Sequence, residues 1–141
     1  TFSKIHGLAS IRVGYGIAHP SLIEVLNRIR QPFNVNAVAQ SMASIAINDH
    51  EHIRKSIELN TQQYEFLFNQ LSELGLECIP SVGNFITFKG DFVGTEIFTN
   101  LMKKGVIVRA VDLYDMKDFI RVTIGTEAEN LKFLRALEEL L

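Results

Sequence analysis

The feature that most constrains the fold is a change of apolar periodicity at Gly75. Before it, residues 51–74 carry apolar side chains at helical spacing, and glycine is common just past the end of a helix. After it, short apolar runs with the alternation of strands are interleaved with further stretches of helical spacing. Strands that alternate with helices are typical of an α/β fold, which we therefore predict.

The expected elements follow from this pattern and from its turn residues. A first helix is expected between Pro20 and Pro32, because proline is tolerated in a first turn and disfavours helix before it. The apolar stretch 37–47 is predicted to be a helix buried on most sides, with Asn36 as its N-cap. The remaining expectations are strands at 11–18, 76–79, 84–89, 106–109 and 119–124, and helices at 51–74 (with a bend or exposed stretch at 58–63), 95–104 and 127–141.

Composition excludes several classes of partner. Hydrophobic residues make up 47% of the 141 residues and charged residues 21%, as in soluble globular proteins. The net charge of −2 gives no basic field for nucleic acid or an anionic membrane, and no apolar run reaches the length of a membrane span. The single cysteine, Cys78, excludes an internal disulfide, suits a reducing compartment and is interpreted as a small apolar strand residue.

The opening segment, residues 1–16, carries candidate ligands for a cofactor. Lys4 can become a nucleophilic amine if its pKa is lowered, and an aldehyde cofactor such as pyridoxal phosphate needs such an amine for a Schiff base. The cofactor phosphate needs hydroxyls and an arginine, which Thr1, Ser3 and Arg12 can supply. On the residues alone, a lysine at this position is more often a solvated surface charge.

Two arginines, Arg109 and Arg121, lie at the end of or within apolar strands. A charge in a central strand is costly unless it is paired. Its partner can be a protein carboxylate or an anionic substrate held by the planar guanidinium, and the residues alone leave both alternatives open. His50 and His52 have a spacing that puts their rings on different sides of a helix, so no metal site is expected.

Four segments, in order, resemble one enzyme family. Thr-Phe-Ser-Lys, with the Gly-Leu and Arg-Val-Gly-Tyr that follow it in residues 1–15, is similar to the cofactor-lysine motif of pyridoxal-phosphate-dependent aminotransferases of the aspartate-aminotransferase fold. The Thr-Phe-Ser-Lys opening is especially similar to histidinol-phosphate aminotransferases, as are Pro-Phe-Asn-Val-Asn (32–36) and Gly-Val-Ile-Val-Arg (105–109). Ile-Arg-Val-Thr-Ile-Gly-Thr (120–126) is similar to the aminotransferase segment that carries the carboxylate-binding arginine. The resemblance covers essentially the whole chain.

The resemblance implies a cofactor site in the opening segment. Lys4 is then the residue that binds pyridoxal 5′-phosphate covalently and later acts as general acid/base. Ser3 and Arg12 hold the cofactor phosphate, with help from Thr1. Ile5 is bulkier than the residue usual after the lysine, a departure that bears on specificity more than on cofactor binding.

The resemblance also implies a substrate site in the second part of the chain. Arg121 then binds the substrate α-carboxylate, and Arg109 binds the substrate phosphate. Asn84 supports the carboxylate arginine in this interpretation, while a plain strand-entry asparagine is an equally good reading of the same residue.

Architecture, partners and reaction follow from the same resemblance. The chain is expected to be the C-terminal portion of a pyridoxal-phosphate-dependent transferase of fold type I. Residues 1–50 would belong to the large domain and 51–141 to the small α/β domain, joined by the helix 51–74. The implied reaction is transamination between L-histidinol phosphate and 2-oxoglutarate in histidine biosynthesis, by a cytoplasmic homodimer. The family's Asp, Tyr and Asn around the cofactor ring have no matching motif here, so the chain alone is expected to be catalytically incomplete.

Other functions remain compatible with the same residues. A related pyridoxal-phosphate lyase, such as threonine-phosphate decarboxylase, would share the lysine and both arginines. An aromatic aminotransferase shares much of the same frame. A non-catalytic structural fragment, whose cations are merely ion-paired, is the third alternative.

Overall fold

The boundary between the two units of the chain falls inside one helix. The computed structural model describes all residues, 1–141, and divides them into the units Thr1–Ile57 and Glu58–Leu141. Helix α3 (His50–Glu73) runs through that boundary without a break, so 58–63 is a largely exposed stretch of helix and not a bend. The division into a large and a small domain stays a prediction.

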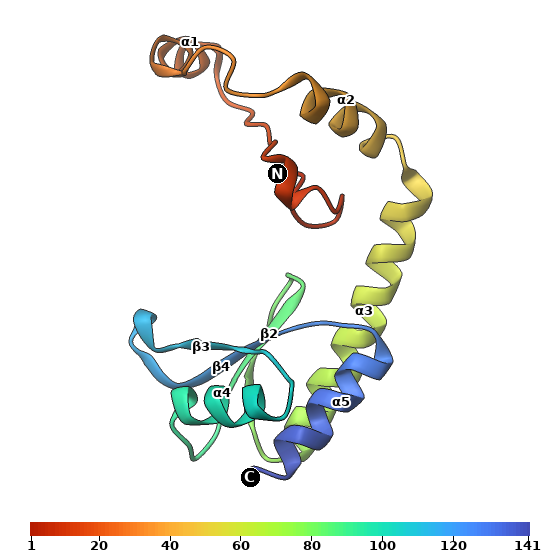
Figure 1. Cartoon of the computed structure of the whole chain (residues 1–141), viewed down its shortest axis with the longest axis vertical. Coiled ribbons are helices and arrows are strands. Elements are labelled where there is room, and N and C mark those ends of the chain that lie inside the picture. The colour runs from red at the N-terminus through yellow and green to blue at the C-terminus, as the bar shows by residue number, and fades with distance from the viewer. The chain divides into compact units, whose positions relative to one another are not determined.

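The first unit contains the lysine-bearing loop and two short helices. The 3₁₀ turn η1 (Ala9–Ile11) is followed by α1 (Pro20–Ile29) and α2 (Ala37–Ala46) (Figure 1). The side chain of Asn36 caps α2 as predicted, because it accepts a hydrogen bond from the N–H of Ala39 at 2.8 Å. No helix anywhere in the chain combines the length and the apolar character that crossing a membrane requires.

Two predictions for this unit are wrong. Residues 11–18 form no strand, because a strand needs a neighbour to pair its N–H and C=O groups, and the paired strands all lie in the second unit. Helix α2 is not buried on most sides: only Ala39 and Ala43 are buried, and Val38 is 64% exposed. An apolar pattern indicates which side chains avoid water, but not whether the same chain covers them.

The second unit is an antiparallel sheet with helices on one face. Its elements are β1 (Glu77–Ile79), β2 (Phe85–Lys89), α4 (Gly94–Lys103), β3 (Arg109–Val111), η2 (Asp112–Tyr114), β4 (Met116–Thr123) and α5 (Glu127–Glu138). The strand order is β1-β2-β4-β3. Helix α5 lies alongside the C-terminal half of α3, as Figure 1 shows, and both contribute to one core with α4. The predicted α/β character is confirmed.

Alternation along the two central strands separates the faces of the sheet. Ile86 of β2 pairs with Val122 of β4, Phe88 pairs with Ile120, and all four side chains are buried in the core. The helices fill the other side of this core at helical spacing, with Leu67, Leu71, Ile97, Leu101, Phe133, Leu134 and Leu137. Because successive strand residues point to opposite faces, the residues between the four buried ones project from the second face of the sheet.

The end of α4 explains why one predicted strand is displaced. Gly105 follows the helix with φ of +72°, a region that glycine enters without steric cost. Val106 then donates its N–H to the carbonyl of Leu101 at 2.9 Å, so it completes the helix end and is not free for the sheet. The strand predicted at 106–109 is therefore wrong, because β3 begins only at Arg109. The other elements expected in this unit are present, with ends that shift by no more than about three residues.

Asn130 is a buried polar residue that joins α5, α3 and the end of β4. Its side chain, 2% exposed, accepts from the N–H of Gly125 at 3.0 Å and donates to the Gly125 carbonyl at 3.2 Å and to Gln63 Oε1 at 2.8 Å. We expect Asn130→Ala to lower the free energy of unfolding by about 2–4 kcal/mol, because the partly buried polar groups of Gly125 and Gln63 lose their partner. Urea denaturation of the full chain measures this, with the exposed Asn69→Ala as control. Equal stability of the two variants would contradict the assignment.

Glu129 gives the second unit a pH-dependent helix cap. Its Oε2 accepts hydrogen bonds from the backbone N–H and the hydroxyl of Thr126, both at 2.8 Å, in a capping box. These bonds, the backbone one first, hold the pKa of Glu129 below its ordinary value of 4.5. A lowered folded-state pKa means stabilisation that is complete above pH 4.5 and is lost as the pH falls through the folded-state pKa.

The stability difference between the wild-type chain and Glu129→Gln should therefore depend on pH. We expect a difference in the free energy of unfolding at pH 7 that shrinks progressively below pH 4.5, since the substituted side chain does not titrate. Urea denaturation over a pH series measures it. A difference of the same size at pH 7 and pH 3 would show that the ionised carboxylate is not the stabilising species.

Candidate active site

The loop that carries Lys4 is folded by short-range hydrogen bonds. Gly7, at φ of +67°, donates its N–H to the carbonyl of Lys4 at 2.9 Å and closes a turn directly after the lysine. Leu8 donates to the carbonyl of Phe2 at 3.0 Å, and Phe2 donates to the carbonyl of Val13 at 3.3 Å. The side chain of Lys4 is exposed and makes no hydrogen bond or ion pair, so its amine is open to an incoming group.

Phe2, His6 and Tyr15 of the opening segment form a cluster of aromatic rings. Phe2 is 5% exposed, and its ring centroid lies 4.8 Å from that of His6 and 5.9 Å from that of Tyr15. The Nδ1 atom of His6 is buried without a hydrogen-bond partner in the chain. Because an unpaired buried nitrogen is destabilising, the loop carries an energetic cost close to its lysine.

The other three residues predicted to bind the cofactor lie in the same loop. Thr1 Oγ1 donates to Ser3 Oγ at 3.0 Å and accepts from the Ser3 N–H at 3.2 Å. Arg12 has φ of +59°, which is uncommon for a residue with a side chain, and its Nη1 donates to the Ala9 carbonyl at 2.5 Å. Two hydroxyls and a guanidinium are donors that suit a phosphate, and Lys4 adds an exposed amine. The donor set therefore fits the chemistry of pyridoxal phosphate.

Arg109 and Arg121 lie directly opposite each other on neighbouring strands. The pairing of β3 with β4 sets Arg109 against Arg121 and, one step further, Ala110 against Ile120. Because Ile120 is buried in the core with the helices, both arginines project from the second face of the sheet. The structure thus brings together two residues that the sequence places in separate strands.

Neither arginine is paired with a carboxylate. The guanidinium of Arg121 lies over the ring of Phe85, 4.9 Å from its centroid, and makes no ion pair, while Arg109 is exposed and makes none either. Like charges that face each other across two strands are destabilising, so this pair favours an anion beside it. A charge in a strand can be paired with a protein carboxylate or with an anionic ligand. For these two arginines the structure contains no carboxylate partner.

Phe85 is a residue of this face that sequence reasoning misses. Its register partner is Thr123, while Thr87 pairs with Arg121, so Phe85 reaches the guanidinium along the diagonal between the two strands. Its position in an alternating run predicts a strand face but not the register of the neighbouring strand. No signal in the sequence identifies the contact.

Asn84 contributes its backbone in this structure. Its carbonyl accepts the N–H of Ile124 at 2.9 Å, which extends the pairing of β2 with β4 by one step. The side chain is exposed and makes no hydrogen bond to Arg121. This is the geometry of a strand-entry residue, and a role in substrate binding stays a prediction.

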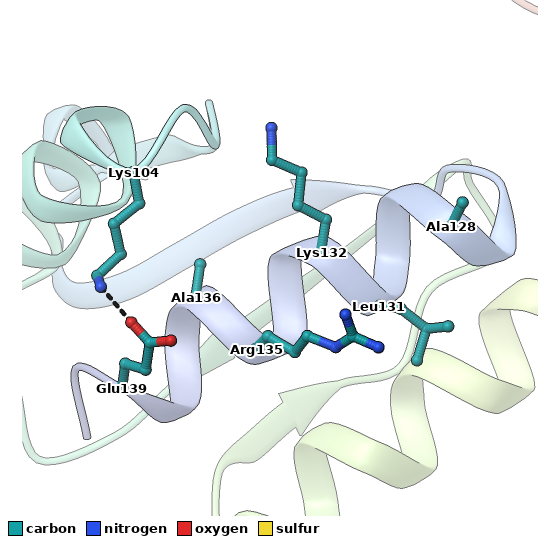
Figure 2. A pocket seen from close by; sticks show the side chains of 7 residues that line it. All are labelled: Lys104, Ala128, Leu131, Lys132, Arg135, Ala136 and Glu139. Atoms are coloured by element: carbon teal, nitrogen blue, oxygen red, sulfur yellow. Dashed lines mark hydrogen bonds and ion pairs between the residues drawn. The ribbon is translucent and has the colours of Figure 1, made fainter.

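A separate pocket of about 440 Å³ lies on α5 and contains none of the predicted site residues. Figure 2 shows Lys104 paired with Glu139 at one end, while Lys132 and Arg135 point in different directions. Lys132 donates to the carbonyl of Gly105 at 2.9 Å. Two of its three cations are thus engaged by protein groups, and the pocket shows no convergent set of donors.

Cys78 behaves as the small apolar residue that its sequence context indicates. It lies in β1 and packs partly buried against the core. Burial raises the pKa of its thiol, and this effect is larger than the opposite effect of a hydrogen bond with Ser72, which lowers the pKa. A raised pKa disfavours the reactive thiolate, so the structure gives this cysteine no catalytic character.

Comparison with known proteins places this fold and these segments in one family. Residues 1–137 match the model of the family "Aminotransferase class I and II". A histidinol-phosphate aminotransferase from Caldicellulosiruptor saccharolyticus is 50% identical over 141 residues, which is the whole of this chain and 39% of that protein. The chain therefore spans well under half the length of that curated relative.

Solved structures agree with the sequence match. The histidinol-phosphate aminotransferase from Clostridium acetobutylicum superposes with a TM-score of 0.91 at 25% identity, over 99% of this chain and 43% of that one. The histidinol-phosphate aminotransferase from Sinorhizobium meliloti, solved in complex with pyridoxal-5′-phosphate, shares the fold with a TM-score of 0.87 at 22% identity, over 100% of this chain and 40% of that one. The predicted resemblance and fold are confirmed, and the chain belongs to the class I and II aminotransferase family.

Proposed function

We propose that the complete protein transfers the amino group of L-histidinol phosphate to 2-oxoglutarate, with pyridoxal 5′-phosphate as cofactor. The observation that supports this most is the facing pair Arg109 and Arg121, two guanidinium groups without carboxylate partners on one face of the sheet. Guanidinium groups bind phosphates and carboxylates through paired hydrogen bonds, and the proposed substrates carry those two anions.

Lys4 is proposed as the residue that holds the cofactor and moves the proton. Its amine would hold the cofactor covalently, and Nζ would also serve as the base that takes a proton from the substrate α-carbon. Thr1, Ser3 and Arg12 hold the cofactor phosphate from the same loop. When bound, pyridoxal phosphate supplies an electron-withdrawing ring that stabilises negative charge at the substrate α-carbon.

Each of the two arginines is proposed to bind a different anionic group of the substrates. Arg121, held over the ring of Phe85, binds the α-carboxylate of glutamate and 2-oxoglutarate. Arg109, directly opposite, binds the phosphate of histidinol phosphate. Asn84 is proposed to assist Arg121 from the start of β2. The planar guanidinium suits both anions, because it can donate two parallel hydrogen bonds to either.

We propose a cytoplasmic homodimer that works in histidine biosynthesis on small-molecule substrates. Exposed apolar side chains in the first unit suit burial against further protein, since such surfaces mark interaction sites. The side chains concerned include Leu22, Val25, Leu26, Ile29, Phe33, Val38 and Ile45. A single free cysteine suits a reducing compartment.

Product analysis of the complete protein tests this function. The protein, loaded with pyridoxal phosphate, is given histidinol phosphate and 2-oxoglutarate, and glutamate is measured. Glutamate that requires both substrates is the expected result. Carbon dioxide released from threonine phosphate would instead identify a decarboxylase, and glutamate formed only from aromatic amino acids would identify an aromatic aminotransferase. Either outcome rejects the proposed substrate.

A further inference from the structure

His52 connects the first turn of α3 to the loop that carries Lys4. Its ring Nε2 lies 2.7 Å from the carbonyl oxygen of Ile5, the residue that follows the lysine. Because a carbonyl can only accept, Nε2 of His52 carries the proton and donates it. The two residues are 47 positions apart in the sequence, and both belong to the unit Thr1–Ile57.

This hydrogen bond is the second one that restrains the backbone next to Lys4. The carbonyl of Lys4 is held by the N–H of Gly7 at 2.9 Å, from within the loop. The next carbonyl, that of Ile5, is held by His52 from outside the loop. Two successive carbonyl groups are therefore held by hydrogen bonds, which restrains the backbone where the Lys4 side chain leaves it.

His52 lies in the first turn of α3, and the N-terminus of this helix is capped. Asp49 Oδ1 accepts the backbone N–H of His52 at 3.0 Å, which is the hydrogen bond of an N-cap residue. The loop itself contains an unsatisfied buried atom, Nδ1 of His6, so its internal contacts are incompletely paired. An anchor from outside the loop is correspondingly important for holding its conformation.

We propose that His52 is a positioning residue for Lys4, an inference that rests on the proposed function. By donating to the Ile5 carbonyl, it limits the orientations of the loop and preorganises the amine for its bond to the cofactor. His52 touches neither cofactor nor substrate in this role. It acts only through the backbone beside the reacting lysine.

Three variants of the complete protein test this role. His52→Leu removes the donor, and His52→Gln keeps an N–H donor on a side chain of similar reach. His50→Leu is the matched control, because His50 is also an exposed histidine in the first turn of α3 but its ring makes no hydrogen bond. Two quantities are measured: amide hydrogen exchange of residues 5–8 without cofactor, and the cofactor dissociation constant from the Lys4-dependent absorbance band.

We expect His52→Leu to raise loop exchange and the cofactor dissociation constant by about 3- to 10-fold, the effect of losing one hydrogen bond. His52→Gln should restore most of both quantities, and His50→Leu should change neither. Equal values for His52→Leu and His50→Leu would overturn the proposal, and so would a glutamine variant as impaired as the leucine one. Failure of the cofactor site itself is distinguishable, because the exchange measurement needs no cofactor and Lys4→Ala tests attachment separately.

Discussion

Replacing Lys4 by alanine is expected to abolish covalent attachment of pyridoxal phosphate. The first unit has two lysines, Lys4 and Lys55, and they differ in their surroundings. Lys55 is paired with Glu51 at 2.7 Å on the surface of α3, whereas the amine of Lys4 has no partner. Reduction of the loaded protein with borohydride, followed by peptide mass mapping, should place the added cofactor mass on Lys4.

Two further variants separate the chemistry of Lys4 from its charge. Lys4→Arg keeps the charge but offers no comparable nucleophile, so it should lose attachment as completely as Lys4→Ala. Lys55→Ala should retain attachment. We expect the turnover of either Lys4 variant to fall by at least about 10³-fold, because covalent binding and proton transfer are lost together. Cofactor mass found on Lys55, or attachment retained in Lys4→Ala, would contradict the assignment.

Replacing Arg121 by alanine is expected to reduce kcat/KM for glutamate and 2-oxoglutarate by about 30- to 4000-fold. Truncating one partner of a charge pair typically costs about 2–5 kcal/mol, and each 1.4 kcal/mol is tenfold. Arg121→Lys should fall between alanine and the wild type, because lysine keeps the charge but lacks the planar fork and stacks less well on Phe85. Steady-state kinetics with each substrate varied separately measures these effects.

The other arginines provide the controls for this prediction. Arg109→Ala should impair histidinol phosphate more than 2-oxoglutarate, since we assign it to the phosphate. Arg135→Ala removes an exposed arginine of α5 that lies outside the predicted site, so it should leave both substrates unaffected. An Arg121→Ala enzyme with wild-type kcat/KM for glutamate would remove the carboxylate assignment.

The elements that local signals specify were predictable from the sequence. Gly75 ends the long helix with φ of +77°, and Asn36 caps α2 through its side chain, both as their residue types predict. The alternation of Ile86 and Phe88 correctly separates the two faces of β2. The strand predicted at residues 11–18 is wrong, because an apolar run forms a strand only where a second segment pairs with it.

The sequence nominates the members of the candidate site but does not give their geometry. Motif resemblance selects Lys4, Arg109 and Arg121 one at a time. The sequence contains no signal that Arg109 and Arg121 face each other, because that register depends on where β3 starts after Gly105. The hydrogen bond from His52 to the carbonyl of Ile5 could not be predicted from the sequence either, since it joins residues 47 positions apart.

An absorbance spectrum of the complete protein with pyridoxal phosphate, recorded beside that of its Lys4→Ala variant, tests cofactor and substrate together. We predict a cofactor band that requires Lys4, changes to the amine form when histidinol phosphate is added and returns with 2-oxoglutarate. A Lys4-dependent band that histidinol phosphate leaves unchanged would contradict the substrate. The absence of any Lys4-dependent band would contradict the enzyme function and favour a structural role for these cations.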